Sequence, residues 1–483
     1  MGRVITYAFT IIAASVFAVV NLSAQPQYTA EKLNFNSNEY NEFAPAFYKN
    51  GDKDGIVFCS NRKNDVLVCY SDTSEEPEKL YDLYYTELNS NGKRWRSAEL
   101  FSDDINTLFN EGPVCFYNQG ANIVFTRNLK TDKKFGSYTK ANNTMGLFFA
   151  EYYNNKWQNI TGFEYNSDEY TIMDPAISSD GKLLYFASNM PGGFGGTDIW
   201  VCKLSYGRWS KPENLGSMIN TNLNEAFPFL HSSGRLYFSS QGWNSKGGYD
   251  IFFSQEIDGK WIHPQSMKEP FNSNADDFGF IADEYLQKGF FSSNRSKSDD
   301  IYAFTSVISE FENCKQQEKN SFCYLFYENG TGEGDVTGTM RYEWDLGDGT
   351  KVRALQAQHC FEKTGTYKIQ LNVIDSLTGE VLLNQAEYDF VVEEIEQPFI
   401  TAPEVANVGE TIQFDAKKSN MKNFKIAKYY WDFGDGLKGI GDNVTHVFYD
   451  EGVYDVKLQL ESTQGRVGIK KACVYRSIVL KKQ

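Results

Sequence analysis

A unit of about fifty residues recurs five times between Glu31 and Phe304. The front half of each unit begins with an acidic residue, continues through a turn and ends in an apolar strand. The five front halves begin at Glu42, Glu111, Asp174, Glu225 and Asp277. Internal repetition with a period of this length indicates a modular architecture in which each unit is one small group of secondary-structure elements.

Each front half is followed by a back half, which begins at Asp82, Gly146, Asp198, Asp250 or Asp300. The first four back halves lead into a further strand at Trp95, Trp157, Trp209 and Trp261. The fifth lacks this strand, and segment 28–42 resembles the sequence that follows the other tryptophans. Four short strands per unit, with the N-terminal strand completing the last unit, predict a closed β-propeller of about five blades. We expect the tryptophans to be structural residues of its core.

These motifs resemble the TolB-like, WD40-like β-propeller repeats of bacterial periplasmic proteins. The resemblance covers roughly residues 28–304, and the third and fourth copies match best. It implies a docking platform, although a propeller fold alone does not define a function.

Downstream of the repeat, two segments match each other at a constant separation of 87 residues. The matching pairs are Trp344 and Trp431, Asp348 and Asp435, His359 and His446, Phe361 and Phe448, Gly365 and Gly452, and Tyr367 and Tyr454. The segments YEWDLGDGT and YYWDFGDGL resemble PKD domains, which are immunoglobulin-like β-sandwiches. The resemblance implies that Trp344 and Trp431 are structural core residues and that Gly-Asp-Gly forms the turn after each. The predicted fold class is therefore all-β, with a propeller followed by two sandwiches.

The first 24 residues have the pattern of a secretory signal peptide, with Arg3, an apolar run and a small-residue cleavage site. We divide the chain into this signal peptide (1–24), a propeller closed by the N-terminal strand (25–308) and two PKD-like domains (309–395 and 396–483). The remaining sequence has no apolar stretch of membrane length, which predicts no membrane span in the mature chain.

The chain carries a formal net charge of −16. This sign disfavours nucleic acid and anionic membrane surfaces as main partners, because both attract basic faces. Protein partners are compatible with it.

Eight cysteines in an exported chain raise the question of disulfides. Cys314 and Cys323 could pair with each other or with Cys360, and Cys473 is expected to stay free. Cys59 and Cys202 replace Ala or Ser of sister repeats, which predicts small buried side chains.

No motif for metalloprotease, serine-hydrolase or phosphate-loop chemistry occurs. The conspicuous acidic residues recur with the repeat instead of forming one asymmetric pair, so we predict that the protein is not an enzyme and needs no cofactor. Calcium stays possible at Asp299 and Asp300 or at the Gly-Asp-Gly turns, because clustered oxygens suit hard cations. His359 and His446 occupy equivalent positions, which favours a structural role over metal binding.

Polar residues follow the same strand in four of the five units and would gather on one rim of the ring. They define a candidate partner-binding rim of Asn61, Arg62, Arg127, Asn128, Asn189, Asn294 and Arg295. The alternative is that these side chains cap turns between strands.

Rigid rims and edges without catalytic motifs predict a non-enzymatic, protein-binding scaffold. The resemblance extends to propeller subunits of type IX secretion-associated envelope complexes. It implies a periplasmic location, peripheral to the outer membrane, with envelope or outer-membrane proteins as partners. The alternative is a carbohydrate-binding or carbohydrate-processing envelope protein, because PKD domains often accompany polysaccharide-degrading enzymes.

Overall fold

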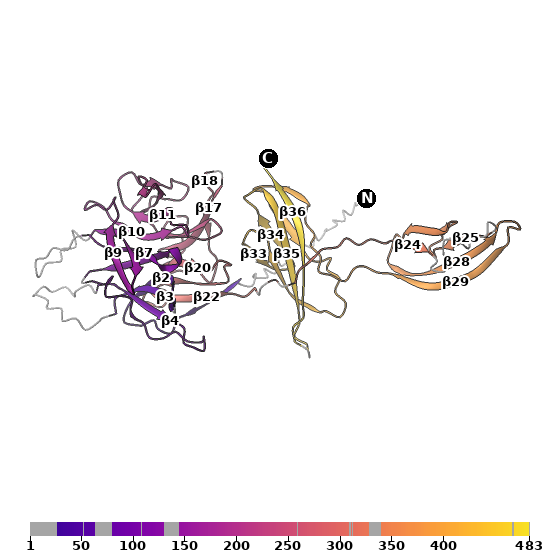
Figure 1. Ribbon diagram of the computed structural model, residues 1–483, viewed down its shortest axis with the longest axis horizontal. Coiled ribbons are helices and arrows are strands. Elements are labelled where there is room, and N and C mark those ends of the chain that lie inside the picture. The colour runs from indigo at the N-terminus through magenta and orange to yellow at the C-terminus, as the bar shows by residue number, and fades with distance from the viewer. Residues whose placement is uncertain are drawn as a thin grey trace, which may run out of the picture.

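The computed structural model describes residues 27–482, except for 52, 63–79, 108, 130–143, 258, 309–310, 312, 328–339 and 466–467. The predicted signal peptide lies outside the described residues. Figure 1 shows three β-rich lobes in a row: the propeller, then the sandwich formed by the C-terminal part of the chain, then the other sandwich. The fold is all-β, as the sequence predicts. The order of the sandwiches in space is the reverse of their order along the chain.

The described residues between 28 and 306 form five sheets. One contains β2 (Glu42–Asn50), β3 (Lys53–Ser60), β4 (Asp82–Glu87) and β5 (Glu99–Leu100). The next contains β6 (Glu111–Tyr117), β7 (Asn122–Asn128), β8 (Met145–Tyr153) and β9 (Lys156–Gly162), with the short helix η1 (Asn118–Gly120) between its first two strands. The third contains β10 (Ile172–Ile177), β11 (Leu183–Ser188), β12 (Asp198–Ser205), β13 (Arg208–Trp209) and β14 (Glu213–Asn214).

The fourth sheet contains β15 (Glu225–Leu230), β16 (Arg235–Ser240), β17 (Asp250–Ile257), β18 (Lys260–Trp261) and β19 (Gln265–Ser266). The fifth contains β20 (Asp277–Ala282), β21 (Lys288–Ser293), β22 (Asp300–Ser306) and β1 (Tyr28–Lys32). Strand β1 pairs antiparallel with β22, in the position that the repeat pattern predicts for the N-terminal strand. The first strands of neighbouring sheets touch all the way round, including β2 with β20, so the sheets form a closed ring.

Aromatic side chains fill the space between neighbouring sheets. One phenylalanine at the same position of the second strand of every sheet is at most 1% exposed: Phe58, Phe125, Phe186, Phe238 and Phe291. The repeat tryptophans pack beside this core. Measured between ring centroids, Trp95 lies 5.5 Å from Phe290 of the fifth sheet, and Trp157 lies 5.9 Å from Phe101. Trp209 lies 6.1 Å from Phe149 of the neighbouring sheet, and Trp261 is partly buried against a core cluster. Burial of each large aromatic side chain stabilises the ring by about 1.5–3 kcal/mol.

The first sandwich comprises β24 (Cys323–Tyr327), β25 (Met340–Asp345), β26 (Lys351–Val352), β27 (Gln356–Cys360), β28 (Gly365–Asp375) and β29 (Val381–Val392). Its sheets are β24–β27 and β26–β25–β28–β29. The second sandwich comprises β30 (Val405–Asn407), β31 (Thr411–Asp415), β32 (Ile426–Asp432), β33 (Lys438–Ile440), β34 (Asn443–Val447), β35 (Gly452–Ser462) and β36 (Lys471–Lys481). Strands β31 and β34 form one of its sheets. The other also contains β23 (Lys315–Gln316), which comes from the segment before the first sandwich.

The two sandwiches share the buried tryptophan and the turn that follows it. Trp344 is 4% exposed and Trp431 is fully buried. In the first turn, Gly347 has a φ of 75°, and a Cβ at this position would lie 2.7 Å from the backbone nitrogen of Lys368. The turn therefore requires glycine both for its left-handed backbone and for its close approach to β28.

Two disulfides join Cys323 to Cys360 and Cys314 to Cys473. The first pair is one of the alternatives that the sequence leaves open. The expectation that Cys473 stays free is wrong, because β23 runs parallel to β36 and places Cys314 beside it. Cys59 and Cys202 are free and fully buried, as the repeat pattern predicts.

Candidate functional site

An asparagine clasps the third strand of every sheet in the ring. The clasping residues are Asn36, Asn106, Asn166, Asn220 and Asn272. Each side chain accepts a hydrogen bond from a backbone N–H and donates one to the C=O of the same residue. The clasped residues are Ile301, Leu83, Leu147, Ile199 and Ile251, and all ten bonds measure 2.7–3.0 Å. Sequence reasoning missed this clasp, although an Asn-Ser or Asn-Thr pair marks it in every repeat.

Replacing Asn220 with alanine is expected to lower the free energy of unfolding by about 3 kcal/mol. The change leaves the N–H of Ile199, a fully buried residue, without its partner, which costs roughly 1–3 kcal/mol. It also removes one of the two hydrogen bonds to the C=O of Ile199, which keeps only the bond from Leu215 N–H. Urea denaturation measures the effect. The matched control is Asn222→Ala, an exposed position two residues away, which should leave the midpoint unchanged. Equal midpoints for the two variants would show that the clasp contributes nothing.

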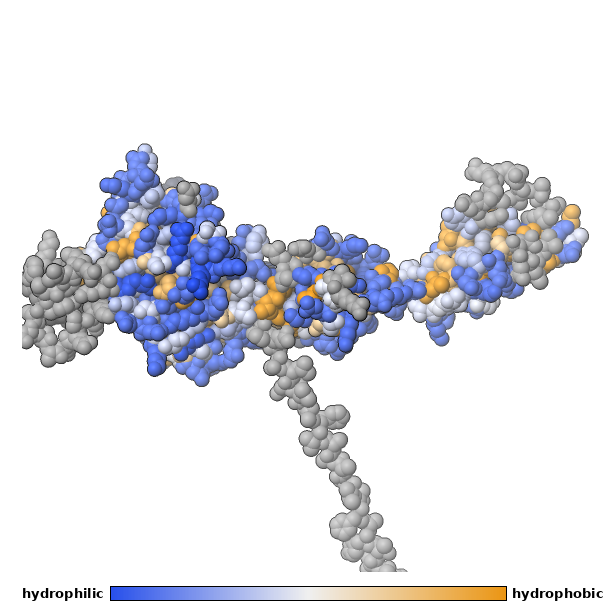
Figure 2. Space-filling model, turned by 90° about the horizontal axis from the view of Figure 1, so that it is seen from below, coloured by the Kyte–Doolittle hydropathy of each residue, from blue (hydrophilic) through white to orange (hydrophobic). Residues whose placement is uncertain are grey.

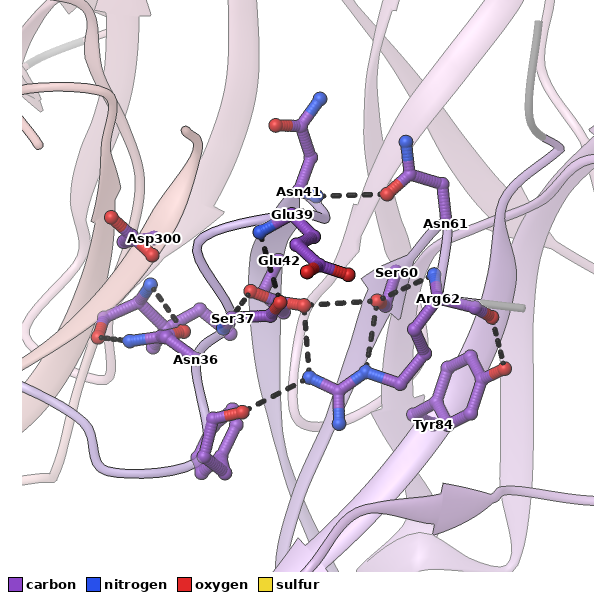
Figure 3. A network of polar contacts seen from close by, with 12 residues as sticks. Asn36, Ser37, Glu39, Asn41, Glu42, Ser60, Asn61, Arg62, Tyr84 and Asp300 are labelled. Atoms are coloured by element: carbon purple, nitrogen blue, oxygen red, sulfur yellow. Dashed lines mark hydrogen bonds and ion pairs between the residues drawn. The ribbon is translucent and has the colours of Figure 1, made fainter. Parts of the chain in front are cut away.

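A buried carboxylate at the start of the first strand ties this clasp loop to the second strand. Four sheets share it, through Glu42, Glu111, Glu225 and Asp277, all fully buried. Each accepts a bond from the backbone N–H of the Ser or Thr after the clasping asparagine. Figure 3 shows the first of these networks, in which Glu42 also accepts from Ser60 and Arg62. Burial raises the pKa of Glu111 to about 7, although Thr107 and Arg127 partly oppose the shift.

The four asparagines of the candidate rim lie at equivalent positions of four sheets, and the blades themselves engage the rim residues. Arg62 and Arg295 follow their asparagines, whereas Arg127 precedes Asn128 and lies opposite Glu111, at the position of Ser60. In each of these four sheets, the backbone N–H of the residue directly before the first strand donates a hydrogen bond of 2.8–2.9 Å to an asparagine side-chain oxygen. The acceptors are Asn61, Asn128, Asn189 and Asn294. The three arginines pair with the buried carboxylates: Arg62 with Glu42, Arg127 with Glu111 and Arg295 with Asp277. Turn capping, the alternative given above, accounts for these contacts. Binding of a partner by this rim stays a prediction.

The third sheet departs from the pattern, and here the sequence alignment of the repeats needs a correction. Ile172 lies opposite Ser188, as Glu42 lies opposite Ser60, so Ile172 and not Asp174 occupies the carboxylate position. Asp174 falls two residues later, in the β-bulge, where the first and fourth sheets have Ala44 and Phe227. All three residues have a φ of about 50–55°, and aspartate is among the residues that tolerate this left-handed region.

Asp174 lies near the centre of the ring and is 4% exposed. Its backbone N–H donates to Thr126, and one side-chain oxygen accepts a bond of 3.3 Å from the N–H of Phe227. Burial raises the pKa of Asp174 to about 7. Close by, aromatic side chains from three sheets are in contact. The ring centroid of Phe227 lies 6.4 Å from that of Phe43 and 4.9 Å from that of Phe278. These three phenylalanine side chains pack against one another near the β-bulges of the first strands, on the inner side of the propeller.

The histidines of the duplicated segments bind the aspartates of the Gly-Asp-Gly turns. His359 Nε2 lies 2.7 Å from Asp348 Oδ2, and His446 Nε2 lies 2.7 Å from Asp435 Oδ2. Burial would raise the pKa of Asp435, but the hydrogen bond and charge of His446, the Leu437 N–H and the charge of Arg235 together outweigh it, so the pKa is lowered. Within the described ranges, no group of three or more His, Cys, Asp or Glu side chains could hold a metal ion. Calcium binding stays a prediction.

Residues 325–381 and 395–474 match the model of the PKD domain family. The chain contains PKD domains. They correspond to the two sandwiches, which are called the first and second PKD domain below. Collagenase ColA of Bacillus cereus is 35% identical over 92 residues, covering 17% of this chain and 10% of that protein. Collagenase ColA of Clostridium perfringens is 24% identical over 206 residues, covering 40% of this chain and 18% of that protein. The chain thus spans less than a fifth of the length of these curated relatives.

Among solved structures, the chain is similar to a putative TolB from Agrobacterium tumefaciens. The TM-score is 0.33 at 12% identity, with 76% of this chain and 90% of that chain covered. In the part of the chain that the structure describes, no helix has the length and apolar character needed to span a membrane.

The second PKD domain docks on the propeller through its Gly-Asp-Gly turn. Arg235 of β16, whose side chain is 5% exposed, donates a bond of 3.0 Å to the backbone oxygen of Asp435. Gln255 and Gln265 bond to Asp450 and Tyr449 of the same domain. The two copies of the duplicated turn therefore differ in use: one is part of an interface, whereas the other lies in the lobe farthest from the propeller (Figure 1).

Replacing Arg235 with methionine is expected to undock the second PKD domain. The variant keeps the aliphatic bulk but removes the only guanidinium that reaches Asp435 among the described residues. Small-angle X-ray scattering should then show a larger radius of gyration and a broader distance distribution. Arg208→Met, at an exposed position of the third sheet, is the control. Identical scattering from both variants would rule out this residue as the clamp.

Proposed function

We propose that this chain is a non-enzymatic periplasmic scaffold, a protein-binding subunit of an outer-membrane-associated assembly such as secretion machinery. The observation that carries the proposal is that the repeated polar residues of the ring bond to the ring itself. The asparagines, carboxylates and arginines of the ring are engaged in holding loops and strands together. Such a ring is a rigid platform, and the docked second PKD domain sets the first one apart from it as a separate lobe.

Two disulfides support a location outside the cytoplasm. Cys314–Cys473 and Cys323–Cys360 would persist in an oxidising compartment such as the periplasm and not among cytosolic thiols. The signal-peptide pattern of residues 1–24 agrees with this.

A carbohydrate-binding or carbohydrate-processing envelope protein is the second candidate. The observation that favours it is Asp174, a buried carboxylate outside the repeated carboxylate position, whose raised pKa of about 7 is the kind that suits a general acid. Glycoside hydrolysis requires a second carboxylate flanking the scissile bond. For Asp174, burial and the Phe227 N–H alone account for the pKa, which favours the scaffold.

A pull-down of the tagged protein from native envelopes in mild detergent, combined with a glycan array, tests the proposal. The scaffold predicts a reproducible set of envelope proteins and no glycan signal. Recovery of the protein alone together with robust glycan binding would overturn it in favour of the second candidate.

A further inference from the structure

The two PKD domains differ at the outer edge of their last strand. In the second domain, the side of β36 that faces away from β35 carries two parallel strands, β23 at Val474 and β30 at Val479. In the first domain, β29 is the counterpart of β36, and in the described part of the chain it pairs with β28 alone. Registers with β28 and β35 make Ala386 and Val391 the counterparts of Val474 and Val479. We call the side of residues 386–392 that faces away from β28 the β29 edge.

The chain segment that could cover the β29 edge lies on the other domain. Residues 313–319 precede β24, as residues 400–407 precede β31, yet they run along β36. The Cys314–Cys473 disulfide, the pairing of Lys315 with Val474 and the bond from Gln317 N to Tyr475 O hold them there. The second domain thus has two covering strands and the first has none among its described residues.

A cleft of about 410 Å³ opens between the two sheets of the first PKD domain. It is lined by Tyr324, Phe326, Trp344, Ala386, Tyr388 and Phe390, among others. In the second domain, Ile400 and Ala406 of the covering segment are buried in the core, and Ala402 and Val408 pack against it. Within the described part of the first domain, the side chains that fill the second domain at this side therefore have no counterpart.

Apolar residues are exposed around the cleft. Leu325 is 54% and Tyr327 is 58% exposed, and by register their counterparts in the second domain are the polar Gln413 and Asp415. Tyr388 is 48% exposed on β29. Figure 2 shows hydrophobic surface on this lobe. A strand edge flanked by exposed apolar side chains is a typical site for the addition of a further strand.

The β29 edge is also acidic. Glu387 and Asp389 lie on β29, Glu393, Glu394 and Glu396 follow directly after it, and no basic residue occurs between residues 386 and 397. Lys368 pairs with Glu387 and Lys422 with Glu393, which leaves an excess of three acidic residues. The counterpart of Tyr388 in the second domain is Arg476, which donates to the backbone oxygen of Ile400. The charge at this edge therefore complements a segment that carries Lys or Arg.

We propose that the first PKD domain binds an extended segment of a partner protein, apolar at alternate positions and flanked by basic residues, as a parallel strand on the β29 edge. Backbone hydrogen bonds would give the affinity, and the aromatic cleft would select the side chains. This inference rests on the proposed scaffold function and names the surface and the chemistry of its partner.

A peptide copy of the covering strand tests the inference with the full-length chain. The probe is residues 399–408, FITAPEVANV, with a lysine added at each end and a fluorescent label. We expect saturable binding with a dissociation constant on the order of 10 μM, and slower amide hydrogen exchange in residues 386–392. A scrambled peptide should not bind. No binding up to about 1 mM, or protection in β36 and not in β29, would overturn the inference.

Tyr388→Asp is the variant, and Tyr206→Asp, at an exposed position of the propeller, is the matched control. The first should weaken peptide binding at least about tenfold and the second should not. Equal affinities would contradict the site, and the exchange measurement on the wild-type chain decides independently of variant folding. Dimerisation of the wild type that Tyr388→Asp abolishes would also overturn it, because the occupant would be a second copy. If envelope partners stay bound to Tyr388→Asp, this inference fails while the proposed function stands.

Discussion

Replacing both Cys314 and Cys473 with serine is expected to destabilise the second PKD domain by up to about 5 kcal/mol. The disulfide closes a loop of 159 residues, and in the chain-entropy model the stabilisation grows with the logarithm of loop length. The loss should also free β23, which contributes only two residues to the sheet. Urea denaturation, followed by a signal specific to the second PKD domain, measures the effect.

The other disulfide provides the control for this result. Cys323–Cys360 closes a loop of 37 residues, so its double serine variant should lose less, about 4 kcal/mol, and only in the first PKD domain. In each PKD domain, a reductant should lower the stability of the wild type to that of the variant lacking the disulfide of that domain. It should leave the stability of a variant that lacks both disulfides unchanged. Equal stabilities of the wild type and the Cys314→Ser/Cys473→Ser chain would contradict the tethering role.

Periodicity makes the architecture predictable from the sequence. The repeated strands and tryptophans predict the ring, and the separation of 87 residues between Trp344 and Trp431 predicts two copies of one sandwich. Both signals are local patterns that a neighbouring copy repeats, so each copy supports the interpretation of the others. The clasping asparagines carry the same kind of signal, in Asn36, Asn106 and their equivalents. It is harder to recognise because Asn-Ser is also an ordinary turn sequence.

Features that depend on pairing between distant segments could not be predicted. Lys315 joins the sheet of the second PKD domain, although its position in the chain assigns it to the first. No local pattern distinguishes the two sheets for so short a strand. The rim illustrates a different limit. A side chain such as Arg62 has the same donors whether it binds a partner or its own Glu42, and only the structure shows that Glu42 engages it.

Asp174 shows how one shifted residue changes an interpretation. As the first residue of a repeat it would be one more member of a carboxylate series, bonded like Glu42. The register of β10 with β11 places it instead in the bulge, near the centre of the ring, where its carboxylate receives one hydrogen bond of 3.3 Å from the described residues. An ionised group held in this way costs stability, because burial removes water that few protein contacts replace.

Asp174→Asn is therefore expected to stabilise the propeller, and more so as the pH rises. The pKa of Asp174 is about 7 in the folded chain and close to its ordinary 3.8 when unfolded. The contribution of the protonated Asp174 side chain to the free energy of unfolding is thus fully present below about pH 4 and is lost as the pH rises through 7. At about 1.4 kcal/mol per pKa unit, the charged carboxylate costs the wild type on the order of 4 kcal/mol at pH 8. Asparagine keeps an oxygen for the Phe227 N–H and does not titrate.

Urea denaturation of the propeller at pH 5 and pH 8 measures this difference. The stability gap between Asp174→Asn and the wild type should widen by roughly 2–3 kcal/mol between these values. Glu169→Gln, at an exposed position of the same sheet's leading loop, should show no such pH-dependent gap. A constant gap for Asp174→Asn would mean that the carboxylate is already ionised at pH 5 and is held by contacts stronger than the one to Phe227. In that case, the balance would tip towards a central site that binds a polar ligand.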